Sequence, residues 1–175
     1  MPIKTIFLDR DGVINKEVNY LHRIEDFEFI DGVFEACLNF ALLCYKIIIV
    51  TNQSGIAKGY FEESEYLKLT YWMVKKFKKE GIEILDIFHC PHSQESNCLC
   101  RKPKPGMFIE AKNKHNINMS ESWMIGDSER DIIAASSAGI KNTILVRSGH
   151  KIDEKNSKAK FYLDSIKDIS NLIKY

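Results

Sequence analysis

Lys4-Thr5-Ile6-Phe7-Leu8-Asp9-Arg10-Asp11-Gly12 is the stretch of this sequence that decides the fold. Residues 4–8 form a short, mainly apolar run that is typical of a buried strand, and the polar residues after it are typical of a loop. The strand therefore delivers the carboxylates of Asp9 and Asp11 to its carboxyl end. Aspartates after strands also cap turns, and Asp-Gly marks a turn by itself. Asp9 and Asp11 therefore indicate a functional site only together with the other residues that the fold brings beside them.

The rest of the chain alternates between helical and strand patterns. Apolar positions spaced as on one helix face predict a helix from Asp31 to Tyr45, with Cys37 and Cys44 in the core. Ile47 to Val50 is β-branched throughout, which is typical of a central strand covered on both faces. Further helices are predicted at 62–80, 105–115, 128–139 and 166–173, and further strands at 84–90, 122–126 and 143–146.

This alternation predicts an α/β fold, with a doubly wound (Rossmann-like) parallel sheet and helices on both faces. We expect a single domain over residues 1–175. Only about 35 residues separate Asp11 from Ile47, and the helix uses many of them. No cap domain fits there, so we expect an open site.

Composition and charge exclude several classes of protein. The 175 residues carry 25 basic and 24 acidic side chains, a formal charge of +1, so no overall field attracts nucleic acid or an anionic membrane. No apolar run approaches the roughly 20 residues of a membrane span, and the N-terminus lacks the features of a signal peptide. We expect a cytoplasmic monomer, with neither nucleic acid nor a membrane as partner.

Polar residues follow three of the predicted strands, where parallel sheets bind their ligands. Asp9, Asp11, Thr51 and Asp127 should therefore converge. Carboxylates gathered at one place repel one another unless a cation lies among them, and an all-oxygen donor set suits Mg²⁺. At an effective dielectric constant of 20, two like charges 4 Å apart cost ~4 kcal/mol. A phosphorylated substrate thus needs the metal and a further cation, which Lys102 can supply.

A second constellation is Cys90-x-His92 with Cys98-x-Cys100. Side chains two residues apart in an extended segment face the same way, so the two pairs can close a tetrahedral Cys3His zinc site. Four protein ligands leave no position for substrate, so this zinc would be structural and would hold the loop 90–104 that carries Lys102. The alternative is three reduced thiols and a surface histidine, because an odd count of five cysteines without a secretion signal does not indicate a disulfide framework.

The ordered motifs resemble the haloacid dehalogenase superfamily of aspartyl phosphatases. They are Asp9-Arg10-Asp11-Gly12, Thr51-Asn52, Lys102 and Gly126-Asp127. Within it, the chain looks like the subfamily of D-glycero-D-manno-heptose 1,7-bisphosphate 7-phosphatases and histidinol-phosphate phosphatases. That closer likeness rests on Phe7 to Gly12, Thr51 to Ala57, Cys90-Pro91-His92 and Cys98 to Pro103.

The resemblance implies a role for each motif residue. Asp9 would attack phosphorus, and Asp11 would protonate the leaving alkoxide and later activate water. Asp9, the backbone carbonyl of Asp11, and Asp127 would hold Mg²⁺, while Thr51 and Lys102 would bind the phosphoryl oxygens. The substrate would contact residues of several loops, namely Glu17, Val18, Asn19, Tyr20, Asn52, Gln53, Ser54, Arg101 and Ser128.

The resemblance further implies hydrolysis of the C7 phosphate of the heptose bisphosphate, a step toward activated heptose for surface polysaccharide. One alternative is a histidinol-phosphate phosphatase, and another is a zinc-stabilised module that only binds phosphosugars.

The roles of two positions stay open. Many heptose bisphosphate phosphatases have a lysine where this chain has Ser128, and Arg101 or Arg130 could partly replace it. Asp131 completes a capping box with Ser128, supports Lys102 or the metal, or does both.

Overall fold

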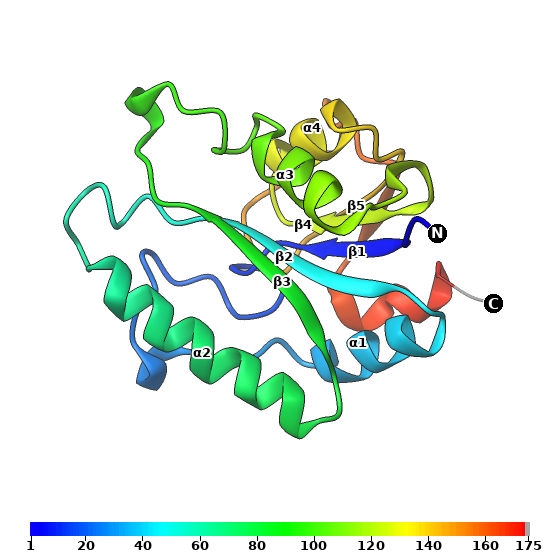
Figure 1. Cartoon of the computed structure of the whole chain (residues 1–175), viewed down its shortest axis with the longest axis horizontal. Coiled ribbons are helices and arrows are strands. Elements are labelled where there is room, and N and C mark those ends of the chain that lie inside the picture. The colour runs from blue at the N-terminus through cyan, green and yellow to red at the C-terminus, as the bar shows by residue number, and fades with distance from the viewer. Residues whose placement is uncertain (174–175) are drawn as a thin grey trace.

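The computed structural model of the protein describes residues 1–173, and these contain one six-stranded sheet. The sheet lies at the centre of the molecule (Figure 1). The strand order is β3-β2-β1-β4-β5-β6, and every neighbouring pair is parallel. Leu8 of β1 pairs with Ile49 of β2 and Ile125 of β4, so the chain leaves β1 between two neighbouring strand ends. The strands are β1 (Thr5–Leu8), β2 (Lys46–Asn52), β3 (Ile84–Cys90), β4 (Trp123–Gly126), β5 (Asn142–Val146) and β6 (Phe161–Leu163).

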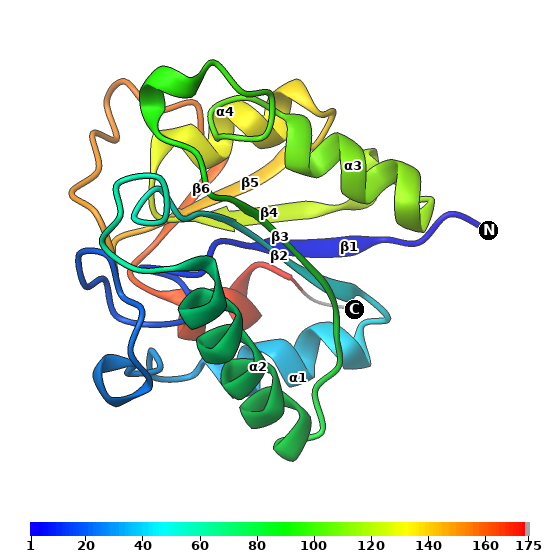
Figure 2. The ribbon, with the colours of Figure 1, turned by 60° about the vertical axis from the view of Figure 1, so that its left-hand side comes forward.

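Helices cover both faces of the sheet, which confirms the predicted doubly wound architecture. Figure 2 shows α1 and α2 on one face and α3 and α4 on the other. None of the helices in the described part of the chain is long and apolar enough to span a membrane. The α-helices are α1 (Val33–Leu42), α2 (Glu63–Lys79), α3 (Gly106–His115) and α4 (Glu129–Ser137), and the 3-10 helices are η1 (Ile24–Asp26), η2 (Gln94–Ser96), η3 (Met119–Glu121) and η4 (Ile166–Asn171).

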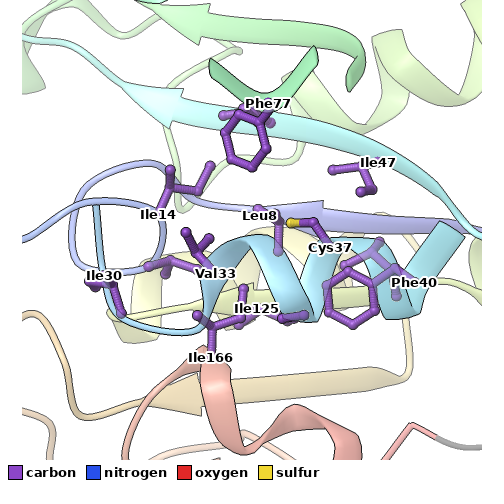
Figure 3. Packing of buried hydrophobic residues seen from close by; sticks show 14 of the residues in the cluster. Leu8, Ile14, Ile30, Val33, Cys37, Phe40, Ile47, Phe77, Ile125 and Ile166 are labelled. Atoms are coloured by element: carbon purple, nitrogen blue, oxygen red, sulfur yellow. The ribbon is translucent and has the colours of Figure 1, made fainter. Parts of the chain in front are cut away.

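Two apolar cores hold the sheet between these layers. On the α1 side, Cys37 and Phe40 point toward Leu8 and Ile125 of the sheet, and Ile166 closes the cluster from η4 (Figure 3). All five side chains are fully buried, and burial of one large apolar side chain contributes about 1.5–3 kcal/mol. The cores therefore fix the strands, and with them the loops at the carboxyl edge of the sheet.

The structure corrects the prediction for the first helix. The helix ends at Leu42, and Cys44 lies beyond it in the left-handed region, with φ of 62°. Cys37 is buried as predicted, but the prediction that Cys44 belongs to the core is wrong, because its side chain is exposed. The apolar spacing continues past the point where the backbone leaves the helix, so periodicity alone overextends it.

The C-terminal region also differs from the prediction. The sequence indicated five strands, whereas residues 161–163 form β6 and pair in parallel with β5. A three-residue edge strand is too short to give a period-2 pattern. The predicted helix at 166–173 is the 3-10 helix η4, which packs against α1.

Candidate active site

Asp9 lies at the centre of the carboxyl edge, where β1 ends. Its backbone N–H donates to the carbonyl of Ile125 at 3.0 Å, which ties this point to β4. The Asp9 Oδ1 atom accepts a hydrogen bond from the backbone N–H of Arg10 at 2.7 Å and lies 3.0 Å from Lys102 Nζ. Asp9 lines a cavity of about 320 Å³, from which a substrate can reach it.

Lys102 reaches Asp9 from the loop between β3 and α3. Its ammonium is buried, donates to the carbonyl of Val50 at 2.8 Å and forms a second ion pair with Asp131 at 2.7 Å. Asn52 fixes the Lys102 backbone: its Oδ1 accepts from the Lys102 N–H and its Nδ2 donates to the carbonyl, both at 3.1 Å. Burial disfavours the ammonium, but Asp131 and Asp9 outweigh it and raise the pKa of Lys102. Lys102 is therefore a fixed cation.

The carboxylate of Asp11 is held from three sides. Arg10 Nη2 donates to both of its oxygens, at 2.9 and 3.0 Å. Asn15 Nδ2 donates to Oδ1 at 3.0 Å, and Gln53 Nε2 donates to Oδ2 at 3.1 Å. Arg10 is itself buried, so it acts as a rigid support. Asp11 still lines the cavity, which is the position that a proton donor to a bound ester requires.

Thr51 is the last residue but one of β2, because this strand runs two residues beyond the predicted strand end at Val50. Its side chain is buried, and its hydroxyl oxygen accepts a hydrogen bond from Gln53 Nε2 at 2.9 Å. The Gln53 amide thus bridges Thr51 and Asp11. Unlike Asp9 and Lys102, Thr51 is not among the residues that line the cavity.

Three carboxylates, that of Asp9 and two beside it, gather with too little positive charge to balance them. Oxygen atoms of Asp9, Asp127 and Asp131 lie within 4.8 Å of one another. Burial raises the pKa of Asp9; Lys102 opposes this, and Asp131, Asp127 and Asp11 add to it. An all-oxygen cluster with excess negative charge fits a hard divalent cation such as Mg²⁺. Such an ion would keep Asp9 ionised.

Asp131 makes both of the interactions that the sequence left open. Its Oδ1 forms the ion pair with Lys102, and its Oδ2 accepts from the backbone N–H of Ser128 at 3.1 Å. The capping box of α4 is therefore present. Because both oxygens are engaged, Asp131 acts as a support for Lys102, and Asp9 and Asp127 are the better candidates for metal ligands.

Sequence reasoning missed His150. Its backbone N–H and its Nδ1 approach Asp127 Oδ2 at 2.9 and 2.6 Å, and the ring lines the cavity. Partial burial disfavours the imidazolium, but Asp127 outweighs it and raises the pKa of His150. Gly12 permits this close packing, since it has φ of 81° and a Cβ there would lie 2.2 Å from Asp127 Oδ2. His150 belongs to no motif, so the sequence carried no signal for it.

The predicted substrate-binding residues come together around the cavity. They arise from the loops after β1, β2 and β3 and from the start of α4, and all nine line it: Glu17, Val18, Asn19, Tyr20, Asn52, Gln53, Ser54, Arg101 and Ser128. The lining also contains Arg130, which the sequence analysis named as a possible replacement for a lysine, and residues that it did not select for this purpose, among them Leu21, Gly55, Lys58, Gln94 and His150. Lys58 follows the Thr51 motif closely, which is the only signal that pointed to it.

The four predicted zinc ligands converge in the loop that carries Lys102. Cys90 Sγ lies 3.6 Å from Cys98 Sγ and 3.0 Å from Cys100 Sγ, and His92 Nδ1 lies 3.2 Å from Cys100 Sγ. A tetrahedral zinc with Zn–S bonds of about 2.3 Å places its sulfur ligands about 3.8 Å apart. The Cys90–Cys98 pair matches this spacing and the Cys90–Cys100 pair is shorter, and all four groups lie close enough to hold one metal ion.

Comparisons with known proteins point to one family. A HAD-hydrolase-like family model matches residues 99–169. D-glycero-β-D-manno-heptose-1,7-bisphosphate 7-phosphatase of Pasteurella multocida is 45% identical, over 98% of this chain and 97% of that protein. This chain belongs to the heptose-bisphosphate phosphatase family of HAD-like hydrolases. The D,D-heptose 1,7-bisphosphate phosphatase of B. bronchiseptica, solved with magnesium and phosphate, superposes with a TM-score of 0.86, 26% identity and coverage of 97% of both chains.

Within this family, overall identity does not separate the two anomeric specificities. A relative named for the α anomer, from Photorhabdus laumondii, is 48% identical over 90% of each chain. The Pasteurella multocida relative, named for the β anomer, is 45% identical.

Proposed function

We propose that this protein hydrolyses the C7 phosphate of D-glycero-D-manno-heptose 1,7-bisphosphate. The observation that carries the proposal is the position of Asp9, which faces the cavity 3.0 Å from the buried ammonium of Lys102 and beside Asp127. Full-length relatives with 45% and 48% identity carry this activity in their names. Hydrolysis through an aspartyl phosphate needs a carboxylate and a fixed positive charge at one place, and the pairing of Asp9 with Lys102 supports the proposal.

The chemistry follows from the two aspartates of the first motif. The Asp9 carboxylate attacks phosphorus and forms an aspartyl phosphate, while Asp11 donates a proton to the leaving C7 oxygen. Asp11 then accepts a proton from the water that hydrolyses the intermediate. Lys102 neutralises charge on the phosphoryl oxygens in both steps. In this proposal the Thr51 hydroxyl binds the same oxygens together with Lys102.

A magnesium ion would be held by Asp9, the backbone carbonyl of Asp11, and Asp127. When bound, it supplies positive charge to the phosphoryl group. Asp127 is oriented for this by His150, which engages its Oδ2 and leaves Oδ1 for the cation. The crystal structure of the B. bronchiseptica relative contains magnesium, which supports this choice of metal.

A zinc ion held by Cys90, His92, Cys98 and Cys100 would be structural. The loop 91–105 has little core of its own, and a bound zinc would fix Arg101 and Lys102 beside the phosphate.

We further propose that one domain over residues 1–175 carries the whole reaction in the cytoplasm as a monomer. In this proposal the partner is the small phosphorylated sugar alone, with neither nucleic acid nor membrane.

Phosphate release tests the proposal directly. We expect magnesium-dependent turnover of both anomers of the heptose bisphosphate, at higher kcat/KM than that of histidinol phosphate. Chelation of magnesium should abolish turnover, and its return should restore it. Preference for histidinol phosphate would instead establish the alternative activity, and binding of the heptose bisphosphate without phosphate release would establish a binding module.

A further inference from the structure

A second cavity, of about 180 Å³, adjoins the one that contains Asp9. Most of its lining belongs to the loop between β3 and α3, and α4 contributes Arg130. Figure 2 shows this loop beside α4 at the top of the molecule. One water molecule takes up roughly 30 Å³ in the liquid, so the space suits a small ion with a few waters. The proposed chemistry assigns the second cavity no role.

The lining of the second cavity is positively charged. Four of its side chains are cationic, and within residues 1–173 no carboxylate lines it. The whole chain is almost balanced by contrast, with 25 basic and 24 acidic side chains. Glu95 belongs to the same loop, but its side chain is exposed and lies outside the lining. The cationic residues of the lining are Arg101, Lys102, Lys104 and Arg130.

Lys104 is the cation that belongs to the second cavity alone. Its Nζ donates to Asn97 Oδ1 at 3.1 Å and to the carbonyl of Cys98 at 2.7 Å. Both acceptors are neutral, and in the described part of the chain Lys104 forms no ion pair. An ammonium group has three N–H donors, so one remains for a ligand and its charge is not neutralised.

The two arginines also keep most of their donors. Arg101 Nη1 donates to the carbonyl of His92 at 3.3 Å, and Arg130 Nε donates to the Ser128 hydroxyl at 3.3 Å. Neither arginine pairs with a carboxylate among the residues that the structure describes. A guanidinium group has five N–H donors in a planar fork, which matches the oxygen atoms of a phosphate. Cations from three directions therefore suit a tetrahedral oxyanion.

A shared wall separates this cavity from the one that contains Asp9. Gln94, Arg101, Lys102 and Arg130 line both cavities, whereas Asp9 lines only the first. A phosphoryl group at Asp9 and an anion beside Lys104 therefore lie on opposite sides of this wall. The same two arginines face both cavities, so an anion in the second cavity engages donors that would otherwise face the first.

We propose that the second cavity binds inorganic phosphate and that this binding inhibits turnover. The inference rests on the proposed function for the source of the ion, because hydrolysis of the ester releases phosphate on the other side of the wall. Bound phosphate draws Arg101 and Arg130 away from the substrate. The product would then slow turnover of an ester that carries a second phosphate more than turnover of a monophosphate.

Calorimetric titration of inorganic phosphate into magnesium-free protein that keeps its zinc tests the binding. Without magnesium, the carboxylates of Asp9, Asp127 and Asp131 repel phosphate from the first cavity. We expect one phosphate per chain. Lys104→Met should weaken the Kd about tenfold, as loss of a charged hydrogen bond does. Asn97→Asp keeps an acceptor for Lys104 but adds a negative charge to the lining, so it should weaken binding further.

The matched control is Lys75→Met on α2, where Lys75 Nζ lies 4.5 Å from the Tyr71 ring centroid, outside both cavities. It removes the same charge and should leave the Kd for phosphate unchanged. Zinc content and thermal melting of each variant show whether the loop is still intact.

Inhibition kinetics with magnesium test the consequence. An inhibitor that acts only at Asp9 has one inhibition constant whichever ester is hydrolysed. We expect phosphate to inhibit wild-type hydrolysis of the heptose 1,7-bisphosphate about tenfold more strongly than that of the 7-phosphate. In Lys104→Met the two inhibition constants should become equal, while kcat/KM without added phosphate stays at the wild-type value on both esters.

Four results would overturn the proposal. They are no binding without magnesium, an unchanged Kd in both lining variants, an equal loss of binding in Lys75→Met, and equal inhibition of the two esters in the wild type. A lower kcat/KM of Lys104→Met on the bisphosphate alone would also overturn it, because the cavity would then hold the substrate's own second phosphate. Failure of the proposed function would look different, since the wild type would not hydrolyse the heptose bisphosphate, whereas calorimetry needs no turnover.

Discussion

Asp131 Oδ1 lies 2.7 Å from Lys102 Nζ, and both side chains are almost completely buried. The other oxygen of Asp131 caps α4 at Ser128. One carboxylate therefore links the start of a helix to the cation that faces Asp9. The position of Lys102 depends on α4 as well as on its own loop.

Replacement of Asp131 by asparagine should weaken both folding and catalysis. The amide keeps an acceptor for the helix cap but removes a buried negative charge, so Lys102 keeps only Asp9 as its ionic partner. We expect the free energy of unfolding to fall by roughly 2 kcal/mol, as for loss of a hydrogen bond to a charged group, and kcat to fall with it. Urea unfolding and phosphate release measure the two effects. Ser128→Ala is the control for the cap alone, and an equal loss of stability there would contradict a role for the ion pair.

Asp9→Asn should abolish turnover and leave the fold intact. The amide is nearly isosteric but cannot attack phosphorus, so we expect kcat to fall by about 10³-fold or more. Thermal melting should show a folded protein. Appreciable turnover in a pure sample of this variant would refute the assignment of the nucleophile.

Asp11→Asn tests the second carboxylate separately. A sugar alkoxide is a poor leaving group without its acid, so we expect kcat for the heptose ester to fall about 10²–10⁴-fold. An ester with a good leaving group, such as p-nitrophenyl phosphate, needs less assistance in the first step and should lose less. Near-native rates on the sugar phosphate would show that Asp11 is not the proton donor.

Much of this site could be predicted from the sequence because it follows from the ends of the strands. Asp9 and Asp127 follow strands that prove to be neighbours, and their convergence needs only a parallel sheet. The Cys3His cluster could also be predicted, because pairs two residues apart in an extended segment share a face. The role of Asp131 could not be predicted, since its position three residues after Ser128 suits a helix cap and equally a contact with the buried Lys102.

Contacts between loops could not be predicted in this way. His150 reaches Asp127 because the chain after β5 folds back, where the Ser148 hydroxyl donates to the carbonyl of Gly12 at 2.7 Å. The Lys58 contact with Tyr20 depends on a left-handed residue at a position where the sequence has no glycine. Neither arrangement has a periodic signal, because tertiary packing alone determines both.

The cysteine cluster should hold one zinc per chain, tightly and distinctly from exchangeable magnesium. Elemental analysis of protein purified without added metal measures it directly. Cys98→Ser should reduce the zinc content and lower both the melting temperature and the activity, because the loop that carries Lys102 loses an anchor. Cys44→Ser, an exposed thiol outside the cluster, is the matched control. Full zinc content and unchanged melting in Cys98→Ser would exclude a four-ligand site.

Alkylation of the metal-free protein should begin at Cys98. Burial works against its ionisation, but hydrogen bonds from the Ser96 hydroxyl and the Arg101 backbone outweigh this and lower the pKa of Cys98 to about 6. Burial raises the pKa of Cys90 instead. The thiolate is the reactive form, so the rate at Cys98 should rise through pH 6 and level off above it, and bound zinc should protect the residue. Peptide mapping after iodoacetamide treatment identifies the site, and first reaction at Cys90 would contradict the prediction.

The final prediction concerns Ser128, where the resemblance implies that many related phosphatases have a lysine. Ser128 caps α4, and it lines the cavity together with Arg101 and Arg130, whose Nε donates to the Ser128 hydroxyl at 3.3 Å. We hypothesise that the missing charge weakens recognition of the second phosphate and relaxes selectivity between anomers and between bisphosphate and monophosphate.

Ser128→Lys should then raise kcat/KM for the bisphosphate about tenfold, as a new charged hydrogen bond would, and should change that for the heptose 7-phosphate much less. The lost cap should cost about 0.5–2 kcal/mol of stability. Ser128→Ala loses the cap without adding charge, so any kinetic effect common to both variants belongs to the helix start. If Ser128→Lys changed kcat/KM equally on both esters, this position would not recognise the second phosphate, and Arg101 with Arg130 would be the remaining cations beside it.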